Sequence, residues 1–221
     1  MSDLDNQTIA VLGGTGPQGR GLARRFAAAG LDVVIGSRDS ERAGAVATEL
    51  STATGTKVRG ADNETAAGLG DIVVVAVPWN GHKELLTGLA QTLADKIVVD
   101  CVNPMGFDKQ GAYALVVEEG SAAQQAASIL TESRVVAAFH HLSAVLLEDP
   151  AIESIDTDVL ILGEDREATD LIGELAGKIP GMRGIFAGRL RNAHQVEALT
   201  CNLISVNRRY KAHAGLRVTD V

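Results

Sequence analysis

A glycine-rich turn between a short apolar run and a helical pattern is the feature that most limits how this chain can fold. The run Thr8–Leu12 is apolar, and Gly14, Gly16 and Gly19 follow it with the spacing G-x-G-x-x-G. A helical pattern then continues to Gly30, which closes it. A strand, this spacing and a helix start in that order bind the pyrophosphate of a dinucleotide, because free N–H groups and the positive helix end face the anion. We therefore expect a dinucleotide site at this turn.

Each glycine of the motif has its own expected role. Gly14 permits the tight turn, Gly16 lets backbone amides approach the pyrophosphate, and Gly19 lets the helix pack closely on the strand. The alternative is a glycine-rich turn that binds no ligand. The strand before the motif and the helix after it favour the dinucleotide site over that alternative.

Short β-branched runs alternate with alanine-rich helical patterns along most of the chain. Several runs are apolar throughout, which is typical of strands covered on both faces. The alternation predicts right-handed βαβ units, and so an α/β fold of Rossmann type with a doubly wound, mostly parallel sheet. We expect strands at Thr8–Leu12, Asp32–Ile35, Lys57–Arg59, Ile72–Val77, Ile97–Cys101, Val135–Phe139, Val159–Leu162 and Met182–Phe186, and helices at Gly19–Ala29, Ser40–Ala53, Gly81–Leu93, Ser121–Leu130 and Arg166–Ile179.

The last part of the chain has a helical pattern with no strand after it. Arg189–Lys211 carries apolar residues at helical spacing, namely Val196, Leu199, Leu203 and Ile204. We expect a nucleotide-binding domain over residues 1–188 and a C-terminal helical appendage over residues 189–221. The appendage packs on that domain or on a second subunit, which makes a homodimer through this helix a plausible expectation.

Composition excludes several classes of partner. The chain has a net charge of −8 and seven aromatic residues, which argues against a polyanion as the main ligand and against base-stacking surfaces. The longest apolar run, Ile72–Trp79, is far shorter than the roughly 20 residues that span a bilayer. The polar start Met1–Gln7 and the separated cysteines Cys101 and Cys201 favour a cytoplasmic protein whose partners are small molecules, with no nucleic acid and no membrane.

The residues after the second strand indicate which dinucleotide binds. Enzymes selective for NAD usually carry an acidic residue there, which accepts from the ribose hydroxyls. This chain has Ser37 and Arg38 instead, with Arg42 one helical turn later. A hydroxyl and two guanidinium groups suit the 2′-phosphate of NADP. In the alternative, both arginines are ordinary surface charges and Asp39 reads the ribose, but Asp39 or Ser40 is better used to cap the next helix.

A proton donor for reducing a ketone is not evident. Neither Tyr113 nor Tyr210 has a lysine four residues on. His140 and His141 end a strand, where neighbouring side chains point to opposite faces, so we expect no metal site; one of them faces the cleft or is a satisfied loop histidine. We expect no catalytic residue. An acceptor that takes hydride without a proton from the protein, such as a flavin-like ring, fits this site best.

The motifs taken together resemble the F420-dependent NADP oxidoreductases. The resemblance extends in order over nearly the whole chain and is carried by LGGTGPQGRGLARRFAAAG, IGSRDSERA, VAVPW, VVDCVNPM and AFHHLSA. It implies reversible hydride transfer between NADP(H) and coenzyme F420, a deazaflavin that acts as co-substrate and carries hydride at C5. The two rings would stack in one cleft, where the enzyme supplies proximity and orientation.

The resemblance also implies roles for individual residues. The pyrophosphate would bind at Thr15, Gly16, Pro17 and Gln18, and the 2′-phosphate at Ser37, Arg38 and Arg42. The nicotinamide end would be lined by Val77, Trp79, Asn103 and Ala144, with His140 nearby on the deazaflavin side. Basic residues of the C-terminal part meet the acidic tail of the deazaflavin coenzyme, or else are solvated or face a dimer partner: Arg183, Arg189, Arg191, Arg208, Arg209 and Lys211.

Two other functions stay open. The first is an NADPH-dependent flavin or ferric-chelate reductase, since the cytoplasmic domain of transmembrane ferric reductases is similar, although we expect no membrane segment here. The second is a non-catalytic protein that senses NADPH with a Rossmann fold, which fold alone does not exclude.

Overall fold

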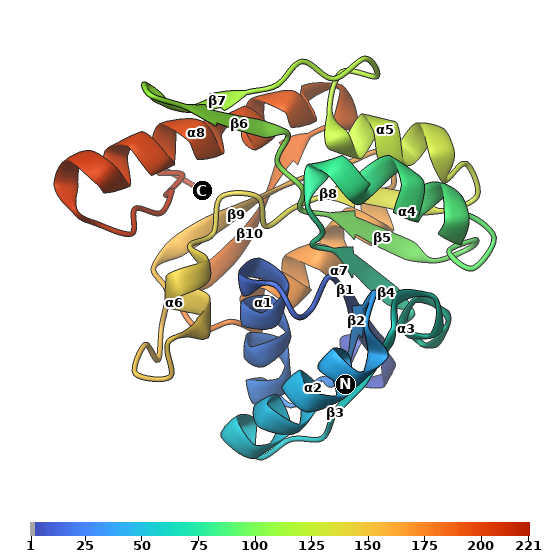
Figure 1. The fold of residues 1–221 in the computed structure, drawn as a ribbon. Coiled ribbons are helices and arrows are strands. Elements are labelled where there is room, and N and C mark those ends of the chain that lie inside the picture. Colours follow the sequence, from blue (N-terminus) through green and yellow to red (C-terminus); the bar gives the residue numbers. More distant parts are fainter. Residues whose placement is uncertain (1–2) are drawn as a thin grey trace.

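An eight-stranded sheet forms the centre of the computed structural model, which describes residues 3–221 (Figure 1). Its strand order is β10-β9-β8-β5-β4-β1-β2-β3. The strands are β1 Thr8–Leu12, β2 Asp32–Ser37, β3 Val58–Asp62, β4 Ile72–Val75, β5 Ile97–Asp100, β8 Arg134–Ala137, β9 Thr157–Gly163 and β10 Met182–Gly188. The helices are α1 Pro17–Ala28, α2 Ser40–Thr54, α3 Asn63–Leu69, α4 His82–Leu89, α5 Ala122–Ile129, α6 Ala144–Glu148, α7 Arg166–Gly177 and α8 Ala193–Tyr210. The predicted α/β fold of Rossmann type is confirmed.

Each face of the sheet is covered by its own set of helices. Successive residues of a strand point to opposite faces, so Ile9 and Val11 of β1 pack with α1, α2, α6 and α7. Ala10 and Leu12 of the same strand pack in the second cluster, with α3, α4, α5 and the start of α8. Because both faces of the central strands are buried, strands such as β1 and β4 are apolar along most of their length rather than alternating.

The expected elements are all present, with ends that differ by a few residues. Helix α1 starts at Pro17 rather than Gly19, because proline suits the first helical position, where its missing N–H is not needed. Asp39 caps α2 by accepting from the backbone N–H groups of Glu41 and Arg42, as expected. The short helices α3 and α6 were not predicted.

The sheet departs from the parallel arrangement at β9, which runs antiparallel to β8. A parallel return needs a crossover of a dozen or more residues, usually a helix packed on the sheet. The stretch 138–156 contains only α6, and α6 packs beside α1 instead of crossing the sheet (Figure 1). The first residues of β9 and β10 therefore lie at the same edge as the last residues of the other strands.

A small antiparallel hairpin, β6 Met105–Asp108 and β7 Gly111–Ala114, was also not predicted. Its strands are short, and Phe107 and Tyr113 are 67% and 47% exposed, so the sequence shows no buried face with period two. The hairpin lies along α8, where β7 contacts the helix (Figure 1).

Arg25 is a buried arginine that fixes the segment around α6. Its guanidinium donates to the carbonyl oxygens of Leu146, Leu147, Asp149 and Ile152 at 2.5–3.1 Å. Buried charge is stable only when it is hydrogen-bonded in this way. Helix α1 therefore holds the end of α6 in place, and with it the chain that leads there from β8.

The helical prediction for Arg189–Lys211 is confirmed by a 3₁₀ turn, Leu190–Asn192, and α8. Helix α8 buries Ala193, Val196 and Cys201 against the domain, while Leu203 and Ile204 are only partly covered. None of the helices within residues 3–221 has both the length and the apolar character needed to traverse a bilayer.

Candidate functional site

The order in which the chain adds strands to the sheet reverses between β1 and β4, and the candidate site lies at this switch point. From β1 the chain continues to β2 and β3 on one side, and then crosses to β4 and β5 on the other. Loops that leave the carboxyl ends of β1 and β4 therefore diverge, and the crevice between them is where α/β sheets of this type bind ligands. Helix α1 starts at this crevice.

The turn after β1 is sterically restricted to glycine at more positions than expected. Gly13 has φ +73°, a left-handed conformation, and a Cβ there would lie 2.5 Å from the carbonyl oxygen of Ala76. We expected Gly14 to permit the tight turn; the left-handed residue of the turn is its neighbour Gly13, while a Cβ at Gly14 would lie 2.6 Å from Ile35 Cβ. Gly19 packs as predicted, since a Cβ would lie 2.6 Å from the Gly13 oxygen.

The residues expected to hold the 2′-phosphate meet at the carboxyl ends of β1 and β2. Thr15 Oγ1 lies 3.4 Å from Ser37 Oγ, and Arg42 Nη2 lies 3.5 Å from the Thr15 carbonyl oxygen. The Arg38 guanidinium has no hydrogen bond or ion pair to any residue within 3–221. The Asp39 carboxylate is engaged by the first turn of α2, so it does not point freely at a ribose.

A cleft of about 380 Å³ opens beside this loop at the carboxyl edge of the sheet. Six of the predicted site residues line it, and the other eight lie at the turn after β1 and at the ends of β2 and α2. None of its lining side chains in the described part of the chain is an Asp, Glu, Lys or Arg. The lining is made of Gln18, Ala76, Val77, Pro78, Trp79, Cys101, Val102, Asn103, Met105, His140, His141, Leu142, Ser143, Ala144, Thr200, Leu203, Ile204, Asn207 and Ala214.

The cleft segment after β8 is set by an unusual backbone at Phe139. This residue has φ +64°, which is rare for a bulky side chain. Two contacts hold it: Gln18 Nε2 donates to its carbonyl oxygen at 3.1 Å, and its ring packs edge-on against Phe26 at 5.9 Å. The turn at Phe139 directs the backbone so that His140 lines the cleft.

His140 is buried at 3% exposure, yet its ring is unpartnered. Neither ring nitrogen has a hydrogen-bond partner within residues 3–221. Burial lowers the pKa of His140 to about 4, so the imidazole is neutral at pH 7 and offers one N–H donor and one acceptor. Asn103 Nδ2 and Thr200 Oγ1 donate to the His140 carbonyl oxygen at 2.7 and 3.1 Å and fix the residue.

Asn103 contributes a second unpaired group to the same cleft. Its amide nitrogen is used by His140, but its Oδ1 is buried without a partner in the described part of the chain. Buried polar atoms without partners are rare in native proteins and each needs an explanation. Both residues, Asn103 and His140, line the cleft.

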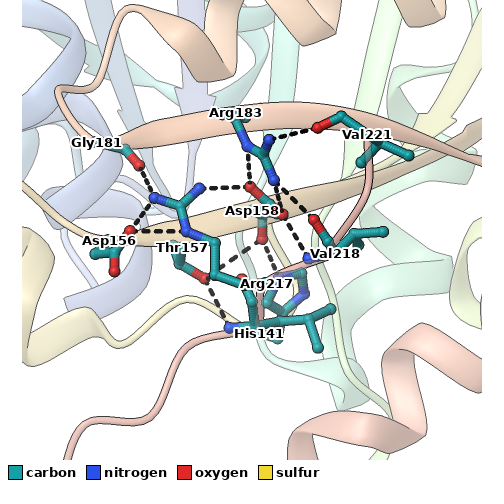
Figure 2. A network of polar contacts seen from close by, with 10 residues as sticks. His141, Asp156, Thr157, Asp158, Gly181, Arg183, Arg217, Val218 and Val221 are labelled. Carbon is teal, nitrogen blue, oxygen red and sulfur yellow. Dashed lines mark hydrogen bonds and ion pairs between the residues drawn. The ribbon is translucent and has the colours of Figure 1, made fainter.

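His141 is directed away from His140 and toward β9. Its Nε2 donates to the carbonyl oxygen of Asp158 at 2.7 Å, and burial lowers its pKa (Figure 2). The two histidines thus have different surroundings. Residues 3–221 contain no group of three His, Cys, Asp or Glu side chains that could bind a metal ion.

One wall of the cleft comes from α8, whose apolar residues were not predicted to belong to the site. Thr200, Leu203, Ile204 and Asn207 line the cavity from this helix. The signal was present, since Leu203 and Ile204 belong to the apolar stripe of the predicted helix. Their place in the cleft depends on how α8 packs on α5, which the sequence does not show.

A buried polar network supports the cleft from behind. His82 Nε2 lies 2.6 Å from Asp100 Oδ2, and His82 Nδ1 lies 3.0 Å from Gln125 Oε1. Burial opposes the charged form, but the Asp100 carboxylate and these hydrogen bonds outweigh it and raise the pKa of His82. Asp100 also accepts from the Val102 N–H, and the Trp79 ring lies 5.4 Å from the His82 ring, so the network orients two lining elements.

Glu197 is a buried carboxyl group of α8 at the start of α5. It accepts from the backbone N–H groups of Ala122 and Ala123 at 2.9 and 3.1 Å. Burial raises the pKa of Glu197 to about 7, although both amides favour the ionised form. The contact ties α8 to α5.

Of the basic residues predicted to meet the acidic tail of the deazaflavin coenzyme, some are already paired with carboxylates. Arg183 is paired with Asp158, and Arg189 with Glu164. Arg208 and Arg209 line a second, open cavity between the hairpin and α8. Arg183 therefore pairs with a buried carboxylate, a structural role that was not predicted from the sequence.

The chain is similar to known proteins in sequence and in fold. A family model described as "NADP oxidoreductase coenzyme F420-dependent" matches residues 8–104. An F420-dependent NADP reductase of Methanothermobacter thermautotrophicus is 40% identical over 221 residues, covering 96% of this chain and 95% of the relative. The crystal structure of a candidate F420-dependent NADP reductase from Arthrobacter sp. FB24 superposes with a TM-score of 0.83 at 27% identity, over 97% of this chain and 100% of that one.

A relative of a different kind is also similar. The metalloreductase STEAP3 of Rattus norvegicus is 31% identical over 191 residues, which cover 86% of this chain. The match spans only 36% of that relative. The similarity is thus confined to about a third of the metalloreductase's length.

The buried Glu197 predicts a pH-dependent stability. Between about pH 4.5 and 7 the folded state keeps a proton that the unfolded state has released, so wild-type stability falls as pH rises through this window. Glu197→Gln removes that dependence. We expect chemical denaturation to show the variant gaining about 3 kcal/mol relative to wild type between pH 4.5 and 8.

The difference between the two proteins isolates this group, because other groups that titrate in the window, such as His140, are common to both. Glu153→Gln, at an exposed position, is the control and should show no such gain. A constant difference between Glu197→Gln and wild type across the pH range would contradict the assignment.

Proposed function

The chain belongs to the family of F420-dependent NADP reductases, and from that premise we propose that it is an oxidoreductase transferring hydride reversibly between NADP(H) and coenzyme F420. The relatives that carry this description match over nearly the full length of both chains. The reaction is direct and needs both ligands in one cleft.

The observation that carries the proposal is the composition of the cleft. It lies at the β1–β4 crevice, and none of the described side chains that line it is an Asp, Glu, Lys or Arg. His140 and Asn103, which line it, have buried polar atoms with no hydrogen-bond partner within residues 3–221. These atoms fit a ring with amide or carbonyl groups, such as a nicotinamide carboxamide or a deazaflavin. An uncharged lining suits a reaction in which neither ring needs a proton from the protein.

When bound, NADPH supplies a hydride donor and F420 an acceptor carbon, so the chain's own residues have a positioning task. The neutral His140 presents one N–H and one lone pair, and Asn103 presents its carbonyl oxygen. Trp79 and Leu203 supply apolar surface that excludes water. Holding two rings in reactive geometry supplies much of the rate enhancement in such reactions.

The phosphate groups of NADP are assigned to the turn after β1. We propose that Thr15, Gly16, Pro17 and Gln18, with the framing glycines Gly14 and Gly19, bind the pyrophosphate at the start of α1. Ser37, Arg38 and Arg42 bind the 2′-phosphate. The proximity of Thr15 to both Ser37 and Arg42 supports this grouping, and the capping role of Asp39 disfavours a site selective for NAD.

We assign residues 1–188 to an NADP-binding domain and residues 189–221 to a helical segment that completes the cleft. Thr200 bonds to the His140 backbone and Glu197 bonds to α5, which supports this division of roles. We propose a homodimer through α8, where Val206 and Tyr210 are 37% and 73% exposed. We also propose a cytoplasmic location, which the free, buried Cys101 and Cys201 support.

The metalloreductase similarity favours one alternative, a reductase of flavins or ferric chelates. The uncharged cleft would accept a flavin ring as well as a deazaflavin. The reductases matched over their whole length favour F420 instead. The two candidates differ in the acceptor that turns over.

Turnover of F420 tests the proposal. We expect the protein, mixed with NADP and reduced F420, to restore the absorbance of the oxidised deazaflavin at catalytic enzyme concentrations. Turnover of flavin or ferric chelate without F420 would favour the alternative. NADPH binding with no turnover would indicate a sensor and contradict both enzyme proposals.

Arg38 should govern the choice of dinucleotide. Arg38→Ala removes a charged hydrogen-bond partner of the 2′-phosphate, so we expect NADP binding to weaken by about 1–3 kcal/mol while NAD binding is unchanged. Fluorescence titration with both nucleotides measures this. Arg59→Ala is the control, because Arg59 pairs with Asp32 at the opposite end of β2. An equal loss for both nucleotides would show that Arg38 does not read the 2′-phosphate.

His140 should help binding and orientation without being essential. His140→Ala removes one hydrogen-bond partner, so we expect kcat/KM to fall by about tenfold and turnover to remain measurable. Steady-state kinetics decide this, with His194→Ala on the exposed side of α8 as the control. Complete loss of turnover with intact nucleotide binding would give His140 a chemical role and contradict the account.

A further inference from the structure

The chain after α8 has no helix or strand, yet it is held along the sheet edge by many hydrogen bonds. Residues 212–221, here called the tail, return from α8 to the first residues of β9 and β10. Leu216 N–H donates to Thr157 Oγ1 at 2.9 Å, and the Asp158 N–H donates to the Leu216 carbonyl oxygen at 2.7 Å. The close approach requires Gly215, where a Cβ would lie 2.7 Å from Thr157 Oγ1.

Asp158 is the centre of these contacts. Its side chain is fully buried, and its carboxylate accepts from Arg183 Nε and Nη2 at 2.8 and 2.7 Å and from Arg217 Nη1 at 2.6 Å (Figure 2). The Val218 N–H donates to the same carboxylate at 2.7 Å. The Arg183 guanidinium holds the pKa of Asp158 far below its usual range, so the group stays charged when buried. Two arginines and one carboxylate thus form a clamp, defined as Asp158, Arg183 and Arg217.

The two arginines of the clamp connect the tail to β10 and to the residues before β9 and β10. Arg183 belongs to β10 and also donates to the carbonyl oxygens of Val218 and Val221, both at 2.9 Å. Arg217 belongs to the tail itself and also donates to Asp156 and to the Gly181 carbonyl oxygen. Paired, hydrogen-bonded charges of this kind are strongly destabilised when one partner is removed.

The clamped tail meets the cleft at two places. Ala214 lines the cavity and is fixed by its N–H, which donates to Asn207 Oδ1 at 2.6 Å. His213 Nδ1 lies 3.3 Å from Ser143 Oγ, in the segment that also carries His140. The Asp158 backbone links the tail to the segment that carries His140 and His141. Its N–H donates to the Leu216 carbonyl oxygen, and its own carbonyl oxygen accepts from His141 Nε2.

The strand order puts this wall far from the phosphate turn. Three strands, β4, β5 and β8, separate β1 from β9. A dinucleotide anchored after β1 would extend its nicotinamide toward the middle of the sheet edge, which would leave the tail side of the cleft for the second ring. Displacement of the tail should change the second ring's site and leave the dinucleotide's anchor intact.

We propose that Asp158, Arg183 and Arg217 are positioning residues that fix the tail-side wall of the cleft and thereby orient the hydride partner of NADP(H). The inference rests on the proposed function for the identity of that partner. It assigns a task to a charge cluster built around the buried Asp158, none of whose three residues lines the cleft itself.

Arg217→Ala is the first test, since Arg217 is partly exposed and its removal leaves Asp158 paired with Arg183. We expect KM for F420 to rise and kcat to fall, each by about tenfold, while the Kd for NADPH changes less than twofold. Quenching of Trp79, the single tryptophan, measures that Kd without turnover. Arg217→Lys keeps the charge and should recover part of the loss.

A second readout follows the tail directly. Trypsin should cleave after Lys211 faster in Arg217→Ala than in wild type, because the tail is released more often. Arg166→Ala, which breaks an exposed pair with Asp170 on α7, is the control and should change neither cleavage nor kinetics. If Arg217→Ala does not fold, Arg217→Lys provides the same comparison with a smaller perturbation.

The outcomes separate the two proposals. A freed tail with unchanged F420 kinetics would overturn the positioning role, and so would unchanged cleavage after Lys211. A parallel loss of NADPH and F420 binding would indicate a general structural role and would also overturn it. Absence of F420 turnover in wild type would overturn the proposed function itself, and with it this inference.

Discussion

The hydrogen-bond ladder of the parallel strands is the constraint on which the rest of the structure depends. Parallel pairing of β2, β1, β4, β5 and β8 brings the carboxyl ends of all five strands to one edge. The antiparallel turn to β9 adds the first residues of β9 and β10 to that edge. Residues as far apart in sequence as Gly13 and Val218 therefore lie along one edge, which no local interaction could achieve.

Because the ladder places the end of β2 beside the turn after β1, it also sets the local charge around the site. The net charge is −8, but Arg38 and Arg42 lie at the end of β2, beside the start of α1. The local field there is opposite in sign to that of the whole molecule. The cleft itself is neutral, because its lining carries no charged side chain and burial keeps His140 uncharged. In the proposed function, the arginines at the end of β2 anchor the dinucleotide, and the uncharged cleft brings the two rings together.

The sequence predicted those features that depend on neighbours along the chain. The turn after β1, the cap at Asp39 and the cluster of Ser37, Arg38 and Arg42 all depend on contacts within or next to one βαβ unit. The eight strands of the large sheet were found because they are short β-branched or apolar runs between helical patterns, and several of them are apolar throughout. Helix α1 and its glycine motif follow from local spacing alone.

The features that were missed depend on contacts distant in sequence. Gly13 was overlooked because its restriction comes from the carbonyl oxygen of Ala76, which follows the neighbouring strand β4 and is distant in sequence. The clamp joins Asp158 to Arg217, and each residue alone looks like an ordinary surface charge. The hairpin β6–β7 has no buried face, so no period marks it. These groups become recognisable only when the packing of α8 and the tail is known.

The central claim is direct hydride transfer between two rings held in one cleft, and isotope transfer tests it most directly. The protein is given F420 and NADPH carrying deuterium at both C4 positions, in ordinary water, and the reduced F420 is examined by mass spectrometry and NMR. The account predicts one deuterium at C5 of the reduced deazaflavin. Reduced F420 that carries only solvent hydrogen at C5 would contradict it.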